Sequence, residues 1–290
     1  MKIQSGEDKY KETLMSMWKL CFPADTDEFI CFYFDKVYKN DETLLLFEDN
    51  SLVASLQMIP YPVKTGHNIH LGGYISGAMT HPDFRKKGYM EKLLNVSFSE
   101  MQKKGYHFTF LIPQQDWLFQ YYSKFGYEKA FPSFIDTIAS VPTEKTDSIY
   151  LRDKEVQTYQ SIDEIDLNDF YIIYSRFLTD KQNAILKTKK QLENILSEVF
   201  SDNGFLLAND WGFAFIFVRE DKIVIKEFYC HDEEIKQIFL LFIGKIHPDK
   251  EIIIQNNPDA HFLRYKGMIK NLTDSDNPLP KDIYLSMMLD

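Results

Sequence analysis

Cysteine is scarce in this chain: only Cys21, Cys31 and Cys230 occur in 290 residues. The three form no Cys-x-x-Cys pair, and no histidine stands near them at the spacing of metal ligands. This excludes a disulfide-stapled scaffold and the common zinc modules. We expect three reduced thiols in the core, a reducing compartment and no metal site.

Long apolar runs are also missing. No run approaches the ~20 residues that a membrane-spanning helix needs. The first residues, from Met1 to Asp8, lack the apolar core of a signal peptide. We therefore expect a cytoplasmic protein without a membrane partner.

Positive charge is in deficit. The chain has 33 Lys and Arg against 43 Asp and Glu, a net charge of -10, of which -3 falls on residues 1–150 and -7 on residues 151–290. Such a chain, without a long basic run, is poorly suited to binding nucleic-acid backbones. It attracts cationic, amine-bearing molecules more readily.

Apolar residues are abundant, at 44% hydrophobic and 15% aromatic, so the chain can form about two domains at ~150 residues each.

Periodicity predicts helices at 7–22 and 26–39, strands at 43–47, 52–59 and 69–80, a helix at 87–104, a strand at 107–112, a helix at 116–125 and a strand at 134–139. A similar order follows, with helices at 163–178 and 188–200, strands at 204–208, 211–218 and 222–230, a helix at 232–246, and strands at 251–255 and 283–289. We expect an α/β protein with a mixed sheet and a duplicated fold: domain 1–141, connector 142–160 and domain 161–290. The second copy lacks a clear short helix after 251–255.

The most informative segment runs from Ala78 to Met90, between a strand and an amphipathic helix. Three basic residues, 85–87, stand at the helix start and are followed by Gly88. The positive end of a helix disfavours cations, so three in a row favour a bound anion such as a pyrophosphate. Gly88 would let the backbone approach the phosphates. The alternative is a solvated basic helix start with an incidental glycine.

Two blocks in this region resemble the GNAT acetyltransferase superfamily. The first is Arg85-Lys-Lys-Gly88-Tyr-Met90, which is similar to (Gln/Arg)-x-x-Gly-x-(Gly/Ala), with Pro82 three residues upstream. The second is Tyr122-Ser-Lys-Phe-Gly-Tyr127, which resembles the family's Tyr-x-x-x-Gly-Phe helix end. The expected order of elements, ααβββαβαβ, is also that of the superfamily.

The resemblance implies that acetyl-coenzyme A is the co-substrate and that no metal takes part. Its pantetheine arm would lie along the strand end at Ala78, and its pyrophosphate at the glycine turn. The expected cofactor-binding residues are Ala78, Met79, Thr80, Arg85, Lys86, Lys87, Gly88, Tyr89 and Met90.

The resemblance also implies that Tyr122 is the catalytic acid, which protonates the departing thiolate. Tyr127 stands where the motif has Phe, and we expect it to pack. The base that deprotonates the amine stays open: His81, His107, Glu128 and Asp136 are candidates by chain position, and a water chain is the alternative. His81 is expected to cap or pack beside the turn.

Met90 replaces the usual small residue of the motif, which predicts a more crowded turn. The same replacement occurs in the branch that resembles the enhanced-intracellular-survival (Eis-like) acetyltransferases, which carry two tandem GNAT folds. The endings Gly267-Met-Ile-Lys and Tyr284–Asp290 look like that branch too. Its members usually carry a sterol-carrier-like domain, which we expect this chain to lack, and a role for the Asp290 chain-end carboxylate stays open.

The second copy is expected to be degenerate. Its strand at 222–230 leads into His231-Asp-Glu-Glu instead of a basic turn, and acidic residues at a helix start repel phosphates. Asp232, Glu233 and Glu234 are interpreted as ordinary first-turn residues. We expect one coenzyme A site per chain, with the second half forming a wall of an acidic acceptor cleft.

The predicted function is N-acetyl transfer from acetyl-coenzyme A to a primary amine of a small cationic molecule, by direct attack on the thioester. Four classes of acceptor stay open: aminoglycosides, polyamines, amino acids and peptide amines. Two alternatives remain, a non-catalytic acyl-coenzyme A-binding or sensing protein and an interaction scaffold. The sequence does not indicate the oligomeric state.

Overall fold

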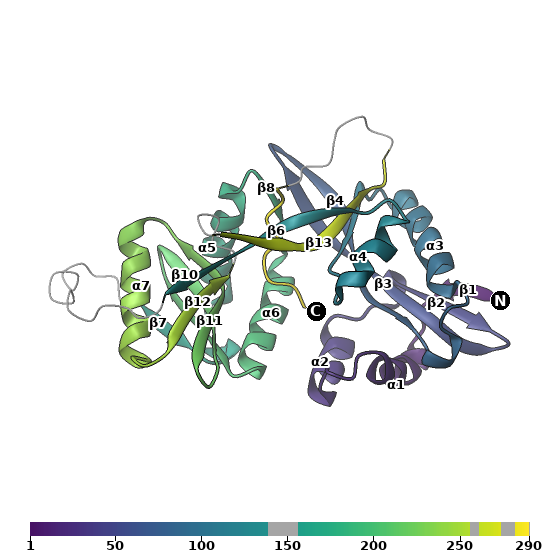
Figure 1. Ribbon diagram of the computed structural model, residues 1–290, viewed down its shortest axis with the longest axis horizontal. Helices are drawn as coiled ribbons and strands as arrows, with labels where there is room; N and C mark the ends of the chain where they lie inside the picture. The colour runs from purple at the N-terminus through teal and green to yellow at the C-terminus, as the bar shows by residue number, and fades with distance from the viewer. Residues whose placement is uncertain (139–155, 256–260, 274–281, 290) are drawn as a thin grey trace. The chain divides into compact units, whose positions relative to one another are not determined.

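The computed structural model describes residues 1–138, 156–255, 261–273 and 282–289 (Figure 1). Contacts group them into two compact units: unit 1 is Met1–Lys129 with Gly267–Pro280, and unit 2 is Ala130–Lys266 with Lys281–Leu289. No helix in the described ranges is long and apolar enough to cross a membrane.

Unit 1 is a mixed sheet with helices on both faces (Figure 1). Its strands run in the order β1-β2-β3-β4-β5-β13, where β13 is His261–Asn271 from late in the chain, and they are antiparallel except for the parallel pair β4–β5. The elements are β1 (Lys2–Ser5), α1 (Lys11–Cys21), α2 (Asp27–Lys36), β2 (Thr43–Glu48), β3 (Ser51–Thr65), β4 (Asn68–Thr80), α3 (Tyr89–Lys103), β5 (Phe108–Leu111) and α4 (Asp116–Ser123).

The two faces of the unit 1 sheet follow the alternation of side chains along its strands. Leu56 and Met58 of β3 share a buried cluster with Leu93 and Leu94 of α3. The alternate residue, Gln57, points to the other face, where α1 and α2 lie. The helix predicted at 87–104 is therefore confirmed, and its apolar stripe faces the sheet.

Unit 2 repeats this topology. Its strand order is β6-β12-β11-β10-β9-β7, antiparallel except for the parallel pair β11–β12. The elements are β6 (Glu128–Ile138), β7 (Gln157–Tyr159), α5 (Leu167–Asp180), β8 (Asn183–Ile185), α6 (Lys189–Ser201), β9 (Gly204–Asn209), β10 (Gly212–Val218), β11 (Lys222–Cys230), α7 (Glu233–Ile246), β12 (Glu251–Gln255) and β13 (His261–Asn271).

The strand beside each parallel pair comes from the other half of the chain. In unit 2, β6 pairs with β12 through Ile135–Ile138. In unit 1, the end of β13 pairs with β5, and Met268 and Leu272 are buried in the unit 1 core. The range expected for the second domain, 161–290, therefore contains residues that complete the sheet of unit 1.

The strand expected at 283–289 is wrong. Apart from one bridge between Ala184 and Tyr284, these residues form no ladder. Leu285 and Met287 to Leu289 are nevertheless buried, so the apolar run indicated burial and not strand pairing. The structure also adds four strands that the pattern missed, β1, β7, β8 and β13. Connector residues 142–155, and the position of the missing helix at 256–260, lie outside the described residues.

The three cysteines are free, but they are not all in the core. Cys21 and Cys230 are half-buried, whereas Cys31 is exposed on α2. The expectation of a core position is wrong for Cys31, because it lies on the solvent side of an amphipathic helix whose buried residues are Ile30, Tyr33 and Phe34.

Glu227 is a completely buried carboxylate on β11 of unit 2. It accepts hydrogen bonds from the hydroxyls of Tyr174 (3.3 Å) and Tyr284 (3.2 Å) and from the amide of Met287 (3.4 Å). Burial raises the pKa of its carboxyl above the ordinary value, although the charge of Lys187 acts in the opposite direction.

This raised pKa predicts how stability depends on pH. The unfolded chain releases the Glu227 proton near the ordinary value of ~4.3, while the folded protein retains it to higher pH. Stability is therefore lost as pH rises from that value through the folded-state pKa. Glu227→Gln removes this titration, so its stability relative to wild type should increase between pH 5 and 8 in urea unfolding. Glu128→Gln, at an exposed carboxylate, is the control; parallel curves for wild type and Glu227→Gln would contradict the prediction.

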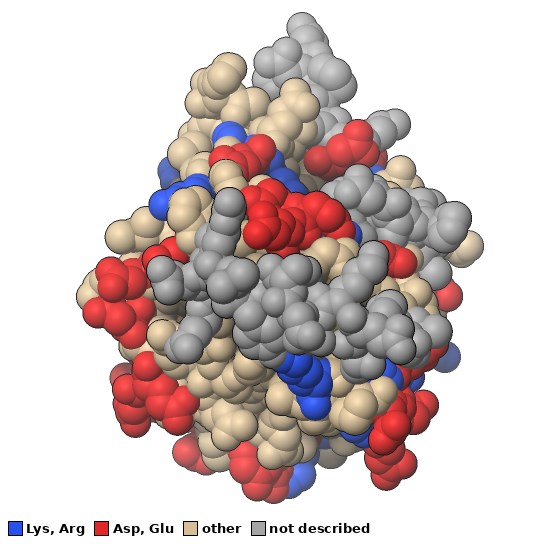
Figure 2. All heavy atoms as spheres, turned by 90° about the vertical axis from the view of Figure 1, so that its left-hand side faces the viewer, with Lys and Arg blue, Asp and Glu red and all other residues tan. Residues whose placement is uncertain are grey.

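The left-hand face of Figure 1, turned toward the viewer in Figure 2, shows more acidic than basic surface. The acidic excess of the second half is thus visible at the surface.

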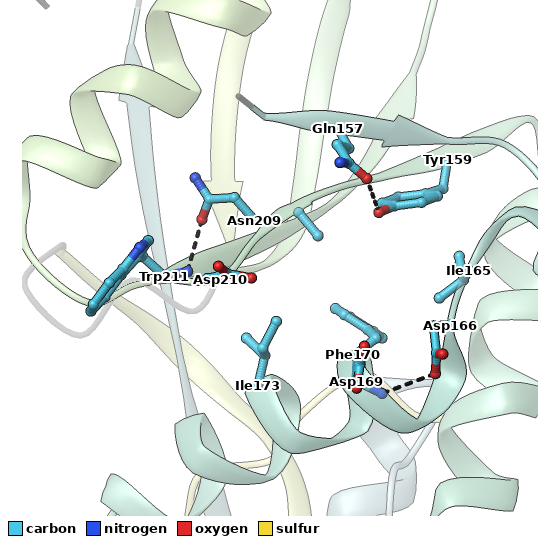
Figure 3. Close-up of a pocket in the computed structure, with 11 residues that line it drawn as sticks. Gln157, Tyr159, Ile165, Asp166, Asp169, Phe170, Ile173, Asn209, Asp210 and Trp211 are labelled. Atoms are coloured by element: carbon cyan, nitrogen blue, oxygen red, sulfur yellow. Dashed lines mark hydrogen bonds between the residues drawn. The ribbon is translucent and has the colours of Figure 1, made fainter. Parts of the chain in front are cut away.

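Unit 2 also contains a cavity of about 520 Å³ between β7, the start of α5 and the turn from β9 to β10 (Figure 3).

Candidate functional site

The sheet of unit 1 opens beside β4. Parallel pairing with β5 covers only Gly72, Gly73 and Tyr74, and β4 then continues for six residues to Thr80 while β5 ends at Leu111. On this edge, no strand among the described residues pairs with residues 75–80. Extended backbone with a free edge can bind another extended chain that carries amides. The predicted residues Ala78 and Met79 lie on this segment.

A β-bulge lies within the open segment. The register between β3 and β4 shifts at Leu56, so that Gly77 and Ala78 together oppose one residue. Gly77 has φ +54°, and a Cβ there would lie 2.6 Å from the ring of Trp18. Both the backbone angle and the close contact require glycine. The bulge therefore alters the backbone of β4 at Ala78, the first of its predicted contact residues.

The glycine turn connects β4 to α3 as predicted. Lys86 (φ +64°) and Gly88 (φ +78°) both adopt the left-handed conformation, and Gly88 is the N-cap of α3. No side chain caps this helix start, so its first N–H groups are available to an anion. A Cβ on Gly88 would meet nothing within 4 Å, so space is open on this side of the turn.

The three basic side chains of the turn are exposed. Arg85 Nε donates to the carbonyl of Thr80 (3.2 Å), which ties the turn to the end of β4. Lys87 Nζ lies 4.9 Å from the ring centre of Phe84. Within the described ranges, none of the three forms an ion pair with a carboxylate. The turn therefore presents net positive charge beside uncapped N–H groups.

The last two predicted cofactor residues differ from the others. Tyr89 is buried, and Met90 packs against the hydrophobic cluster of unit 1. Their backbone N–H groups belong to the first turn of α3, where helix geometry leaves them without an intrahelical partner. The crowding expected from Met90 does not follow, because its side chain is directed to the core. Thr80 likewise already uses its carbonyl, which accepts from Arg85 and from Cys21 Sγ (3.4 Å).

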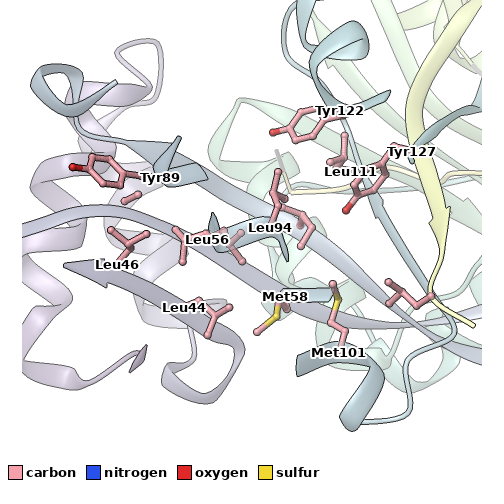
Figure 4. Close-up of a cluster of buried hydrophobic side chains, with 14 of the residues drawn as sticks. Leu44, Leu46, Leu56, Met58, Tyr89, Leu94, Met101, Leu111, Tyr122 and Tyr127 are labelled. Carbon is pink, nitrogen blue, oxygen red and sulfur yellow. The ribbon is translucent and has the colours of Figure 1, made fainter. Parts of the chain in front are cut away.

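Tyr122 lies on α4 beside the end of β5. It is 8% exposed and packs in the same cluster as Leu111 and Tyr127 (Figure 4). Burial, and to a smaller extent neighbouring Tyr121, raises the pKa of its phenol above the ordinary value. The phenol is therefore neutral at physiological pH, as a proton or hydrogen-bond donor must be. A raised pKa makes complete transfer to a thiolate less favourable and favours a donated hydrogen bond.

Tyr127 has the packing role expected for it. It is buried, and its hydroxyl lies 3.0 Å from Thr109 Oγ1 on β5. Figure 4 shows Tyr122 and Tyr127 on either side of Leu111. Burial raises the pKa of the Tyr127 phenol as well, while the hydrogen bond to Thr109 acts in the opposite direction.

The candidate bases are separated by their positions. His81 Nδ1 accepts from the amide of Asp83 (3.3 Å) and caps the short 3₁₀ helix Pro82–Phe84, which confirms the capping interpretation. The backbone amide of His107 donates to the carbonyl of Leu71, at the opposite end of the β4–β5 pair. Leu71 lies seven residues from Ala78, which is ~23 Å along a strand. His107 is therefore too far from the open segment to act there. Glu128 begins β6, and Asp136 pairs with β12 in unit 2.

Unit 2 has the same strand divergence but a different helix start. β11 pairs with β12 only from Lys222 to Ile225 and continues to Cys230. Here Asp232 caps α7 by accepting from the amide of Ile235 (2.9 Å), and Glu233 and Glu234 follow. The interpretation as ordinary first-turn residues is confirmed for Glu233 and Glu234, whereas Asp232 is the N-cap residue that precedes them. The helix start that is open and basic in unit 1 is capped and acidic in unit 2.

Sequence reasoning missed two features of the open segment. A lone glycine within a strand pattern is a known signal of a bulge, so Gly77 could have been identified. Gln57 could not: it is 4% exposed, its Nε2 lies 3.4 Å from the Cβ position of Gly77, and its Oε1 has no partner among the described residues. Only tertiary structure brings this amide beside the bulge.

Comparisons with known proteins agree with this geometry. The family model of the acetyltransferase (GNAT) domain matches residues 2–130. No curated protein matches the sequence. Among the similar solved structures is a GCN5-related N-acetyltransferase from Anabaena variabilis, with a TM-score of 0.75, 13% identity, and coverage of 94% of this chain and 73% of the other.

Two further structures carry related folds. Eis1 from Mycobacterium abscessus has a TM-score of 0.69 and 11% identity, with coverage of 94% of this chain and 74% of the other. A tandem GNAT protein from the clavulanic acid biosynthesis pathway has a TM-score of 0.50 and 10% identity, with coverage of 95% and 100%. At these identities the likeness shows the fold. Residues 2–130 thus match the acetyltransferase (GNAT) domain family, and the mixed α/β fold of the chain is shared with GNAT-fold structures, tandem GNAT proteins among them.

Proposed function

We propose that this chain transfers an acetyl group from acetyl-coenzyme A to a primary amine of a small cationic molecule. One observation carries the proposal: an uncapped helix start with a basic glycine turn directly follows the open segment of β4. A pyrophosphate matches the first feature, and an amide-bearing pantetheine arm matches the second. The residues proposed to contact the cofactor are Ala78, Met79, Thr80, Arg85, Lys86, Lys87, Gly88, Tyr89 and Met90.

The proposed reaction is direct attack on the thioester. The amine nitrogen forms a bond to the carbonyl carbon, the carbon–sulfur bond breaks, and coenzyme A leaves as a thiolate. A backbone N–H of the open β4 segment stabilises the developing oxyanion. Tyr122 donates to the sulfur, and water accepts the proton of the amine. Of the candidate bases, His107 lies at the far end of the β4–β5 pair, and His81 uses its Nδ1 to cap the 3₁₀ helix Pro82–Phe84, which favours water in this role.

The acceptor class rests on charge. The chain carries a net charge of -10, and a field of this sign raises the encounter rate of cations. The second unit is proposed to bind no coenzyme A, because its equivalent helix start is capped by Asp232 and followed by two glutamates. The proposed division of labour is one cofactor site in the first half and a folded, acidic second half.

Release of free thiol from acetyl-coenzyme A, measured across a panel of amines, tests the function. We expect release that depends on an amine with an ammonium group and that falls as salt screens the field. Matched neutral alcohols are the control for acceptor-independent hydrolysis. If acetyl-coenzyme A binds tightly but no amine of the panel causes release of free thiol, the proposal of an enzyme is wrong. The chain would then be an acyl-coenzyme A-binding protein.

A further inference from the structure

Trp117, in the first turn of α4 in unit 1, holds a large aromatic ring in solvent. It is 60% exposed, whereas Trp211 is 39% and Trp18 is 4% exposed. Its indole N–H already donates to Oε1 of Gln115, so the exposure does not serve a hydrogen bond to water. What Trp117 presents to solvent is the apolar surface of its ring, which another flat ring can cover.

The neighbouring ring on α4 does not cover Trp117. The ring centre of Tyr121, one turn later, lies 6.4 Å from that of Trp117, and the two planes are inclined by 65°, so the rings do not stack. Tyr121 itself packs against the hydrophobic cluster of unit 1. Tyr121 and the bond to Gln115 therefore fix the position of the indole, while most of its surface stays uncovered.

Trp117 lies on the side of α4 that faces the start of α3. Burial, and then the charge of Glu91 in the first turn of α3, raises the pKa of the Tyr121 phenol, which places Tyr121 beside that turn. Residues four apart lie on the same side of a helix, so Trp117 shares this side with Tyr121. Phe119 marks another side of α4, where Lys129 Nζ lies 5.6 Å from its ring centre.

Trp117 is also about level with the glycine turn. α3 follows β4 and α4 follows β5, and because β4 and β5 pair in parallel, both helices begin at the same edge of the sheet. Trp117 is one turn, ~5.4 Å, nearer to the start of α4 than Tyr121 is. On α3, Gly88 precedes Glu91 by ~4.5 Å of helix rise. The two distances nearly match, which places the indole beside the turn.

The cofactor of the proposed function brings a flat ring to this place. Coenzyme A carries one aromatic group, adenine, which a single ribose separates from the pyrophosphate. The pyrophosphate is proposed to lie at the uncapped start of α3, beside the exposed basic residues 85–87. The rings of the turn itself are already covered, since Tyr89 is buried and Lys87 Nζ lies 4.9 Å from the ring centre of Phe84. Trp117 is the open ring next to them.

We propose that Trp117 stacks on the adenine of acetyl-coenzyme A and thereby makes the chain selective for the nucleotide-bearing form of the acyl donor. The inference rests on the proposed function, because it takes the position of the pyrophosphate from that site. Stacking uses the faces of both rings and does not need the indole N–H, which is already bonded to Gln115. A donor without the nucleotide gains nothing from Trp117.

Thiol release by the whole chain with two acyl donors tests the proposal. The donors are acetyl-coenzyme A and S-acetylpantetheine, which lacks the nucleotide. For Trp117→Leu we expect the KM for acetyl-coenzyme A to rise by ~5- to 150-fold, the range for a lost base–aromatic stack, with kcat nearly unchanged. The kcat/KM for S-acetylpantetheine should stay the same. Trp117→Phe keeps a smaller ring and should lie between Trp117→Leu and the wild type.

Trp211→Leu is the matched control, because Trp211 is also exposed but belongs to unit 2. It should leave the KM for both donors unchanged. An equal loss with both donors would make Trp117 a structural support of the site, and a rise in the KM for the amine alone would assign it to the acceptor; either result overturns the proposal.

Calorimetry separates this inference from the function on which it rests. If the wild type binds acetyl-coenzyme A and Trp117→Leu binds it with equal affinity, adenine lies elsewhere and the proposed function stands. If the wild type does not bind acetyl-coenzyme A, the proposed function is wrong and the role of Trp117 falls with it.

Discussion

Gly88→Glu should weaken the affinity for coenzyme A by at least ~100-fold, which is a loss of about 2.7 kcal/mol of binding free energy. The new carboxylate would stand at the uncapped start of α3, in the open space where a pyrophosphate is proposed to lie. It would repel the phosphates and compete with them for the same N–H groups. Calorimetric titration of the wild type should give one site per chain, and none for the variant.

A matched control exists at the other end of the same helix. Gly105 follows the C-terminus of α3 with φ +79°, and a Cβ there would also meet nothing within 4 Å. Gly105→Glu therefore brings the same charge and the same left-handed strain, which costs ~1–2 kcal/mol in either variant. Only Gly88→Glu should lose binding. If it retains one site per chain with unchanged affinity, coenzyme A binds somewhere other than this turn.

Local features of the site could be predicted from the sequence. The start of α3 was predicted because the glycine and the apolar stripe of Leu93 and Leu94 are both readable within a few residues. The acidic start of α7 was predicted for the same reason. The packing of Tyr127 followed from a match within one short helix end. In each case the information lies within one or two turns of the chain.

Features that depend on distant pairing could not be predicted. The open edge of β4 exists because β5 stops at Leu111, and no pattern within residues 75–80 indicates that. The pairing of β13 with β5 joins residues about 160 positions apart, and the apolar run at 283–289 was more strand-like in composition than β13. Burial of Tyr122, and with it the raised pKa of its phenol, likewise depends on packing against β5 and α3.

Burial also decides what Tyr122 can contribute. A phenol whose pKa lies above its ordinary value of ~10 cannot readily protonate a thiolate whose conjugate thiol has a pKa of ~8.5. Its contribution should grow as charge develops on sulfur while the bond breaks, which is when a donated hydrogen bond is strongest. Tyr122 is therefore proposed to act on the transition state more than on bound acetyl-coenzyme A.

Tyr122→Phe should lower kcat by ~10²-fold, at the lower end of the 10²–10⁴ range for general acids. The affinity for acetyl-coenzyme A should change little, because the lost interaction forms mainly in the transition state. Single-turnover thiol release isolates the chemical step. Rescue should occur with an acyl donor whose leaving thiol has a lower pKa, since such a thiolate needs less stabilisation. A general loss of folding would not produce that dependence on the leaving group.

Tyr127→Phe is the matched control, since it removes a buried hydroxyl from the same cluster. That hydroxyl bonds to Thr109 on β5, so its loss should cost stability by ~1 kcal/mol. It should leave kcat unchanged, because the Tyr127 hydroxyl already has a protein partner. Comparing the two variants thus separates loss of packing from loss of the donor. If both lower kcat equally, or if Tyr122→Phe leaves the single-turnover rate unaltered, Tyr122 has no part in the chemistry and the thiolate must leave without a protein acid.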